Sequence, residues 1–123
     1  MKRNPDLIRD LMLALEAAEG AELLRVPDVS GYPRHEIDHH FRLLVEAGLA
    51  LAAHVSSDGR RWVAVRLTWS GHDYLDAIRD GRVWKHTKAA MKKTGFWSLE
   101  TMGAIARTII LQRLEALGIG PNP

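Results

Sequence analysis

One motif in the sequence could carry metal chemistry: His-Glu-x-x-His at residues 35–39. Histidines four positions apart in a helix share one face, so His35 and His39 could chelate zinc while Glu36 acts as a general base. The chain contains no cysteine, which excludes disulfides, thiol catalysis and thiolate metal ligands. A zinc metallopeptidase is therefore the first hypothesis to weigh.

The residues around the motif argue against that hypothesis. Helices of this kind keep charge away from the positions between the glutamate and the second histidine, but Asp38 lies there and Arg34 precedes the motif. Positions 42 and 45 are not histidine, so the third ligand of the longer three-histidine pattern is missing. No glutamate occurs at residues 47–99, which leaves only Asp73 or Asp76 as a replacement. We expect no enzyme, metal or cofactor, and we keep the zinc metallopeptidase as the weakest alternative.

The motif lies in a helix that the sequence predicts over residues 34–47. Apolar side chains recur there at helical spacing and are expected to face inward, namely Ile37, Phe41, Leu44 and Val45. Gly48 ends the helix. His35 and His39 then belong to a charged outer face that contacts solvent or nucleic acid. We expect His40 to be packed and hydrogen-bonded to the backbone of the following hairpin.

A β-hairpin is predicted directly after this helix. Alternating segments at residues 49–55 and 61–67 are joined through Asp-Gly, a strong signal for a hairpin turn. The turn places Arg60 and Arg61 at its tip. A helix that runs into a hairpin has the order of a recognition helix and its wing.

Apolar spacing and capping residues predict four further helices, over residues 5–19, 69–79, 82–93 and 99–117. Residues 21–33 are weakly patterned: Leu23, Leu24 and Val26 could form a short strand, and only about one helical turn fits at residues 27–30. A standard helix-turn-helix has a complete second helix in this place.

The length and composition indicate a globular protein with a single domain. It has 123 residues, of which 46% are hydrophobic, and a net charge of +2. No apolar run approaches the ~20 residues of a spanning helix, and no signal peptide is visible, so we expect a cytoplasmic protein. The predicted fold is mainly α with a β-hairpin: a winged helix-turn-helix-like domain at residues 1–80, followed by C-terminal helices at residues 81–123. These helices are expected to pack on that domain or to form a dimer interface, within a single compact unit.

Two stretches carry a resemblance to known proteins. Residues 40–49, His-Phe-Arg-Leu-Leu-Val-Glu-Ala-Gly-Leu, resemble the end of the recognition helix in winged-helix regulators, and Leu-Thr-Trp-Ser-Gly at residues 67–71 resembles their exit from the wing. Over nearly its full length the chain is similar to a family of phage and prophage proteins of unknown function. That resemblance implies a winged-helix fold and a mobile-element origin, without an established activity.

A winged helix binds DNA by setting helix side chains against base edges while basic groups hold phosphates. The candidates here are listed along the chain: Arg34, His35, His39, Arg42, Arg60 and Arg61. Glu36 and Asp38 interrupt this face with negative charge. The main functional hypothesis is therefore binding of duplex DNA, and the runner-up is a module that binds a protein partner.

The last predicted helix is apolar over much of its circumference, which is typical of a central core helix or of half an oligomer interface. We predict a homodimer through the following residues: Met102, Ile105, Ile109, Ile110 and Leu114.

Overall fold

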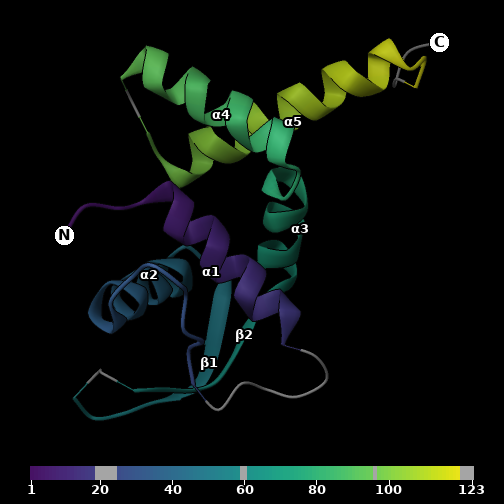
Figure 1. Cartoon of the computed structure of the whole chain (residues 1–123). Helices are drawn as coiled ribbons and strands as arrows, with labels where there is room; N and C mark the ends of the chain where they lie inside the picture. Colours follow the sequence, from purple (N-terminus) through teal and green to yellow (C-terminus); the bar gives the residue numbers. More distant parts are fainter. Residues whose placement is uncertain (19–24, 59–60, 96, 120–123) are drawn as a thin grey trace. The chain divides into compact units, whose positions relative to one another are not determined.

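The protein is described by a computed structural model that covers residues 1–18, 25–58, 61–95 and 97–119 (Figure 1). Within these residues it is mainly α-helical with one antiparallel β-hairpin, as the sequence predicts. The elements are α1 (Pro5–Ala17), α2 (Arg34–Glu46), β1 (Ala50–Val55), β2 (Trp62–Leu67), α3 (Trp69–Ile78), α4 (Gly81–Thr94) and α5 (Leu99–Ala116). None of these helices combines the length and the apolar character needed to cross a membrane.

The chain separates into two compact units, residues 1–75 and residues 76–123. The division falls within α3 rather than after residue 80. The first unit holds α1, α2 and the hairpin, and the second holds α4 and α5.

Helix α1 begins where the sequence predicts. The side chain of Asn4 accepts hydrogen bonds from the backbone N–H groups of Asp6 (3.0 Å) and Leu7 (3.2 Å), which satisfies two donors that the first turn leaves free. The helix packs on α2 and β2. Its apolar stripe and the inward side chains of α2 form a core with no exposed surface at Leu7, Ile8, Leu11, Met12, Phe41 and Leu44.

Helix α2 ends at a glycine for a clear backbone reason. Gly48 has a φ of +76°, a left-handed conformation that costs glycine little. The N–H of Leu49 donates to the carbonyl of Leu44 (2.9 Å), and the N–H of Gly48 donates to the carbonyl of Val45 (3.0 Å). This pattern caps the last turn and directs the chain into β1.

The hairpin pairs Ala50 with Leu67 and Val55 with Trp62. Between these ends, Ala64 has a φ of +58°, which is uncommon for a residue with a Cβ atom. The strict alternation expected for β2 breaks at this residue: Val65 is buried, yet Trp62 also packs inward. The Trp62 ring centroid lies 5.3 Å from that of Phe41.

The step from β2 to α3 explains the Leu-Thr-x-x-Gly stretch. The Thr68 hydroxyl donates to the carbonyl of Gly48 (2.7 Å) and accepts from the N–H of Gly71 (2.9 Å). A Cβ atom added to Gly71 would lie 2.0 Å from the carbonyl oxygen of Leu49, closer than any side chain tolerates. Glycine at this position therefore lets α3 pass directly over the start of β1.

Residues 25–33 depart from the prediction. They contain neither a helical turn at residues 27–30 nor a strand at Val26. Leu23 and Leu24, the other members of the predicted strand, lie outside the described residues, as does Arg60 at the predicted tip of the hairpin. Val26 and Val29 are nevertheless buried, so this segment is packed without regular secondary structure.

The second unit consists mainly of α4 packed against α5. Asp80 caps α4 by accepting from the N–H groups of Arg82 (2.8 Å) and Val83 (3.0 Å). These hydrogen bonds lower the pKa of its carboxyl group, and the bond from Val83 has the larger effect. Ser98 caps α5 through the N–H of Thr101 (3.0 Å), as predicted.

Candidate nucleic-acid interface

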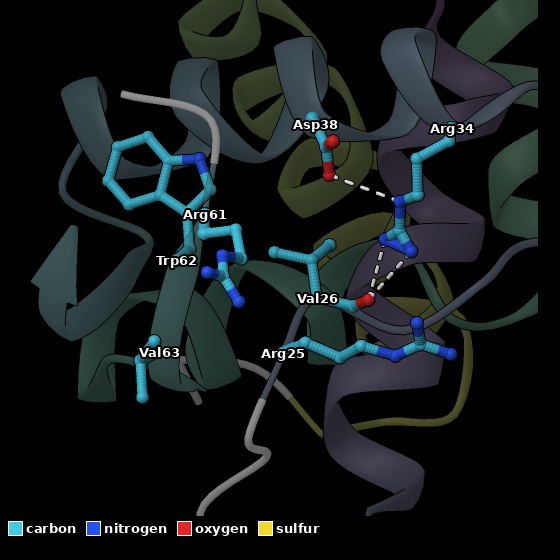
Figure 2. A pocket seen from close by; sticks show the side chains of 7 residues that line it. All are labelled: Arg25, Val26, Arg34, Asp38, Arg61, Trp62 and Val63. Atoms are coloured by element: carbon cyan, nitrogen blue, oxygen red, sulfur yellow. Dashed lines mark hydrogen bonds and ion pairs between the residues drawn. The ribbon is translucent and has the colours of Figure 1, made fainter. Parts of the chain in front are cut away.

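A cavity of about 450 Å³ lies beside α2 in the first unit (Figure 2). It is bounded by the start of α2, the start of β2 and the segment that precedes α2. Its lining residues are Arg25, Val26, Arg34, Asp38, Arg61, Trp62 and Val63. The volume falls within the range of pockets that hold small ligands.

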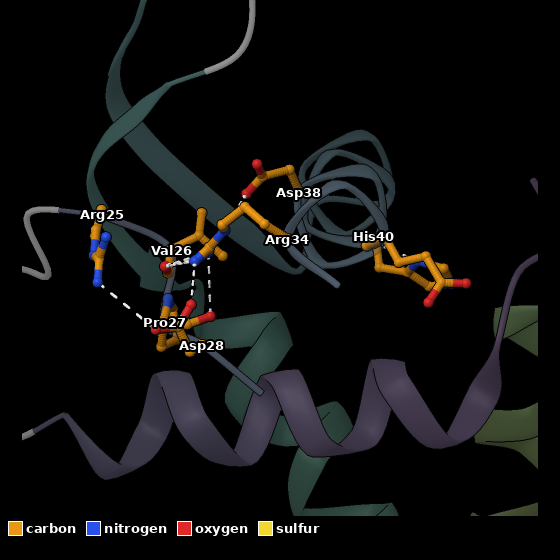
Figure 3. A network of polar contacts seen from close by, with 8 residues as sticks. Arg25, Val26, Pro27, Asp28, Arg34, Asp38 and His40 are labelled. Atoms are coloured by element: carbon orange, nitrogen blue, oxygen red, sulfur yellow. Dashed lines mark hydrogen bonds and ion pairs between the residues drawn. The ribbon is translucent and has the colours of Figure 1, made fainter. Parts of the chain in front are cut away.

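Arg34 fixes one wall of this cavity. Its guanidinium donates to the carbonyl of Val26 from two nitrogens (2.6 and 2.9 Å), to the Asp28 carboxylate (2.9 Å) and, through Nε, to Asp38 Oδ1 (3.3 Å) (Figure 3). Arg34 is one of the predicted DNA contacts, but these bonds occupy its donors. Its principal role is to tie the irregular segment at residues 25–28 to α2.

Arg25 and Arg61 supply the exposed positive charge around the cavity. The Arg25 side chain is 77% exposed, and its ion pair within the described part of the chain is a long one with Asp28 (3.7 Å). Arg61 is exposed, and among the described residues its side chain forms no ion pair; Figure 2 shows it between Trp62 and Val26. The predicted partner of Arg61 at the wing tip, Arg60, lies outside the described residues.

Trp62 forms the aromatic wall of the cavity, and its packing against Phe41 holds the ring in place. The indole Nε1 is buried and has no hydrogen-bond acceptor among the described residues. A buried donor without a partner carries a free-energy cost, so packing rather than hydrogen bonding places this ring.

The outer face of α2, formed by His35, His39, Arg42 and Glu46, presents mixed charge to solvent. The pKa of His39 is lowered, mainly by its partial burial and then by the neighbouring His40, the chain's amino group and Arg42, while Glu46 opposes the shift. This face holds three of the predicted DNA contacts but no concentrated positive charge.

His40 is packed, as predicted, but its partners are different. It is fully buried on the side of α2 away from Arg34 and Asp38 (Figure 3). Its Nε2 accepts from the backbone N–H of Asn4 (2.8 Å), and its Nδ1 lies 2.8 Å from the carbonyl of Glu36. The predicted bond to the hairpin backbone is therefore wrong: the ring joins α2 to the start of α1.

The metal hypothesis gains no third ligand from the fold. Within the part of the chain that the structure describes, no three histidine, aspartate or glutamate side chains come close enough to hold a metal ion.

The residues of the predicted dimer interface differ in exposure. Met102 is fully buried, which leaves it no surface to offer a second chain. The other four are partly exposed: Ile105, Ile109, Ile110 and Leu114. The predicted homodimer itself stays a prediction.

Sequence comparison places the chain among known proteins. Residues 2–97 match the family described as "Hypothetical protein (DUF2513)". The chain belongs to this family. A relative from Haemophilus influenzae, described as an uncharacterized protein, is 40% identical over 117 residues, which covers 93% of this chain and 99% of the relative. No solved structure matches.

The DUF2513 match covers α1 to α4 and stops before α5 begins at Leu99. The cavity therefore lies wholly within the part of the chain that defines the family. Sequence reasoning selected Arg34 and Arg61 from its lining but missed Arg25 and Trp62 as site residues. Arg25 lies in an unpatterned segment, and Trp62 looked like an ordinary strand residue, so neither carried a signal.

Proposed function

We propose that this DUF2513 protein is a winged-helix-like protein of phage or prophage type. In this proposal it acts in the cytoplasm as a regulator that binds duplex DNA. The order α1, α2, hairpin supports this proposal because it is the order of a recognition helix and its wing. The segment at residues 25–33, which contains no helix, is the departure from a standard helix-turn-helix.

The observation that carries the proposal is the convergence of Arg25 and Arg61 at one cavity beside α2. Guanidinium groups pair well with phosphate oxygens, and the ion pair of Arg25 with Asp28 is long (3.7 Å) and exposed, so it costs little to exchange. In this arrangement the two arginines hold the DNA backbone, while His35, His39 and Arg42 face the groove. Phosphate contacts of this kind set affinity and position.

The test is binding of labelled duplex DNA over a series of salt concentrations. The Arg25→Ala/Arg61→Ala variant should bind more weakly, and the slope of log affinity against log salt should fall by about 1 for each arginine removed. Lys92→Ala/Lys93→Ala removes equal charge from exposed positions on α4 and serves as the matched control. No binding of any duplex at low salt, or equal losses in both variants, would contradict the proposal.

A second candidate is a protein-interaction module. Four large apolar side chains are exposed in or beside the hairpin: Leu51 (44%), Val55 (50%), Val63 (37%) and Trp69 (82%). Exposed apolar groups that gather on one element favour a protein partner or a second copy of the chain. The Trp69→Ser variant separates the candidates, because it should leave duplex affinity unchanged if DNA is the partner.

A further inference from the structure

We propose that the cavity beside α2 binds one unpaired nucleotide, with its base against Trp62 and Asp38 and its phosphate at Arg61 and Arg25. The inference rests on the proposed function, because it takes nucleic acid as the ligand. It adds a preference for a base that is not in a duplex. The chemistry applies equally to a free nucleoside phosphate and to an unpaired nucleotide within a strand.

The walls of the cavity suit a flat aromatic ring. Trp62, Val26 and Val63 line it, and Phe41 supports the Trp62 ring at a centroid distance of 5.3 Å. Bases stack on aromatic side chains whatever their sequence, and a ring already held by packing loses little freedom on binding. Figure 2 shows Trp62 and Val26 on opposite sides of Arg61.

The polar groups of the cavity suit the two ends of a nucleotide. Arg61 and Arg25 offer positive charge for a phosphate. Asp38 Oδ1 accepts from Arg34 Nε, and among the described residues no group donates to its second carboxylate oxygen. That oxygen can accept from an exocyclic amino group, such as N4 of cytosine.

Asp38 also argues against an acidic peptide as the occupant, because its carboxylate would repel another carboxylate at short range. Arg34 balances the charge of Asp38 and keeps its side chain in place (3.3 Å). A base whose flat face lies against Trp62 inside the cavity has left the base stack of a duplex, and it is therefore not paired. The site therefore selects an unpaired base, as in proteins that extrude a nucleotide from the stack.

The direct experiment compares a labelled duplex that contains one unpaired cytosine with the fully paired duplex. The unpaired cytosine should raise affinity about tenfold, the range of one good base contact. In Asp38→Asn the amide oxygen can keep the bond to Arg34 while the amide nitrogen becomes a donor, so the preference should move from unpaired cytosine toward unpaired thymine. Glu115→Gln removes an equal charge from an exposed position on α5 and should change neither the affinity nor the base preference.

Deoxycytidine monophosphate, titrated by calorimetry and as a competitor, separates the two sources of the ligand. If it binds and the unpaired cytosine also raises affinity, the ligand is a nucleotide within a strand. If deoxycytidine monophosphate binds and the unpaired cytosine has no effect, the ligand is a free nucleotide. This conclusion holds even if paired DNA does not bind, a result that would contradict the proposed function. No calorimetric binding together with equal affinity for both duplexes overturns the inference, as does an unchanged base preference in Asp38→Asn.

Discussion

One side of α2 carries a sequence motif, and the other side lines a cavity. The outer face carries the His-Glu-x-x-His histidines, yet none of its residues lines the cavity of Figure 2, and its charges are mixed. The cavity side of α2, formed by Arg34 and Asp38, has no recognisable motif, yet it meets Trp62, Arg61 and Arg25 from other segments. A motif on one helix reports spacing along that helix, whereas a site needs groups that other elements bring to it.

The largest expected effect comes from Gly71→Ala, which displaces the hairpin that forms half of the cavity. The new Cβ atom would overlap the Leu49 carbonyl oxygen at 2.0 Å, and this contact is with backbone that cannot rotate away. We expect a loss of about 3 kcal/mol in the free energy of unfolding, measured by urea titration. Gly81→Ala is the control, because its added Cβ meets nothing within 4 Å and should be neutral or slightly stabilising.

A smaller loss is expected from Arg34→Met, which removes the connection between α2 and residues 25–28. The carbonyl of Val26 loses both of its guanidinium bonds, and we expect a cost of about 1–2 kcal/mol. Arg42→Met makes the same change at an exposed position of the outer face, where side-chain contacts are worth little, and should cost less than Arg34→Met. Equal costs in urea titration would show that the two sides of α2 do not differ as described.

Replacing Ala64 with glycine should stabilise the protein slightly. The φ of +58° is unfavourable for alanine and free for glycine, so we expect a gain of up to about 1 kcal/mol in thermal unfolding. Ala53 lies on β1 between the partners of Val65 and Val63 and has no positive φ, so Ala53→Gly should destabilise instead, because glycine weakens an ordinary strand. A loss in Ala64→Gly as large as that in Ala53→Gly would refute the strained conformation.

The smallest effect concerns the outer face. Because the pKa of His39 is lowered on folding, the unfolded chain binds the proton more tightly than the folded protein. The stability that the neutral ring contributes is complete above its ordinary pKa near 6.5, and is lost as the pH falls from there toward the lowered folded value. His39→Gln should reduce the loss of stability between about pH 7.5 and 5.5 by less than about 1 kcal/mol, measured by urea titration at each pH. An undiminished loss would mean that other groups carry the dependence.

Local features of the fold could be predicted because their causes lie close together in the sequence. Asn4 and Ser98 cap helices through groups two or three residues away, and Gly48 ends α2 within its own last turn. The segment at residues 25–33 could not be predicted, because it has no sequence pattern of its own. Its hydrogen bonds to Arg34 and the burial of its valines in the core fix its conformation. His40 was recognised as packed, but its partner Asn4 lies 36 residues away.

The sequence by itself determined the helices, the hairpin and the caps at Asn4 and Ser98, since periodicity and capping act within a few residues. It also showed that the zinc motif has no histidine at position 42 or 45, where the longer three-histidine pattern would need one. Only the tertiary structure decided which side of α2 adjoins a cavity, because Arg25, Asp38 and Trp62 come from three separate segments. The face of Trp62 was decided in the same way: the left-handed backbone at Ala64 turns the ring onto Phe41, against the alternation of the strand.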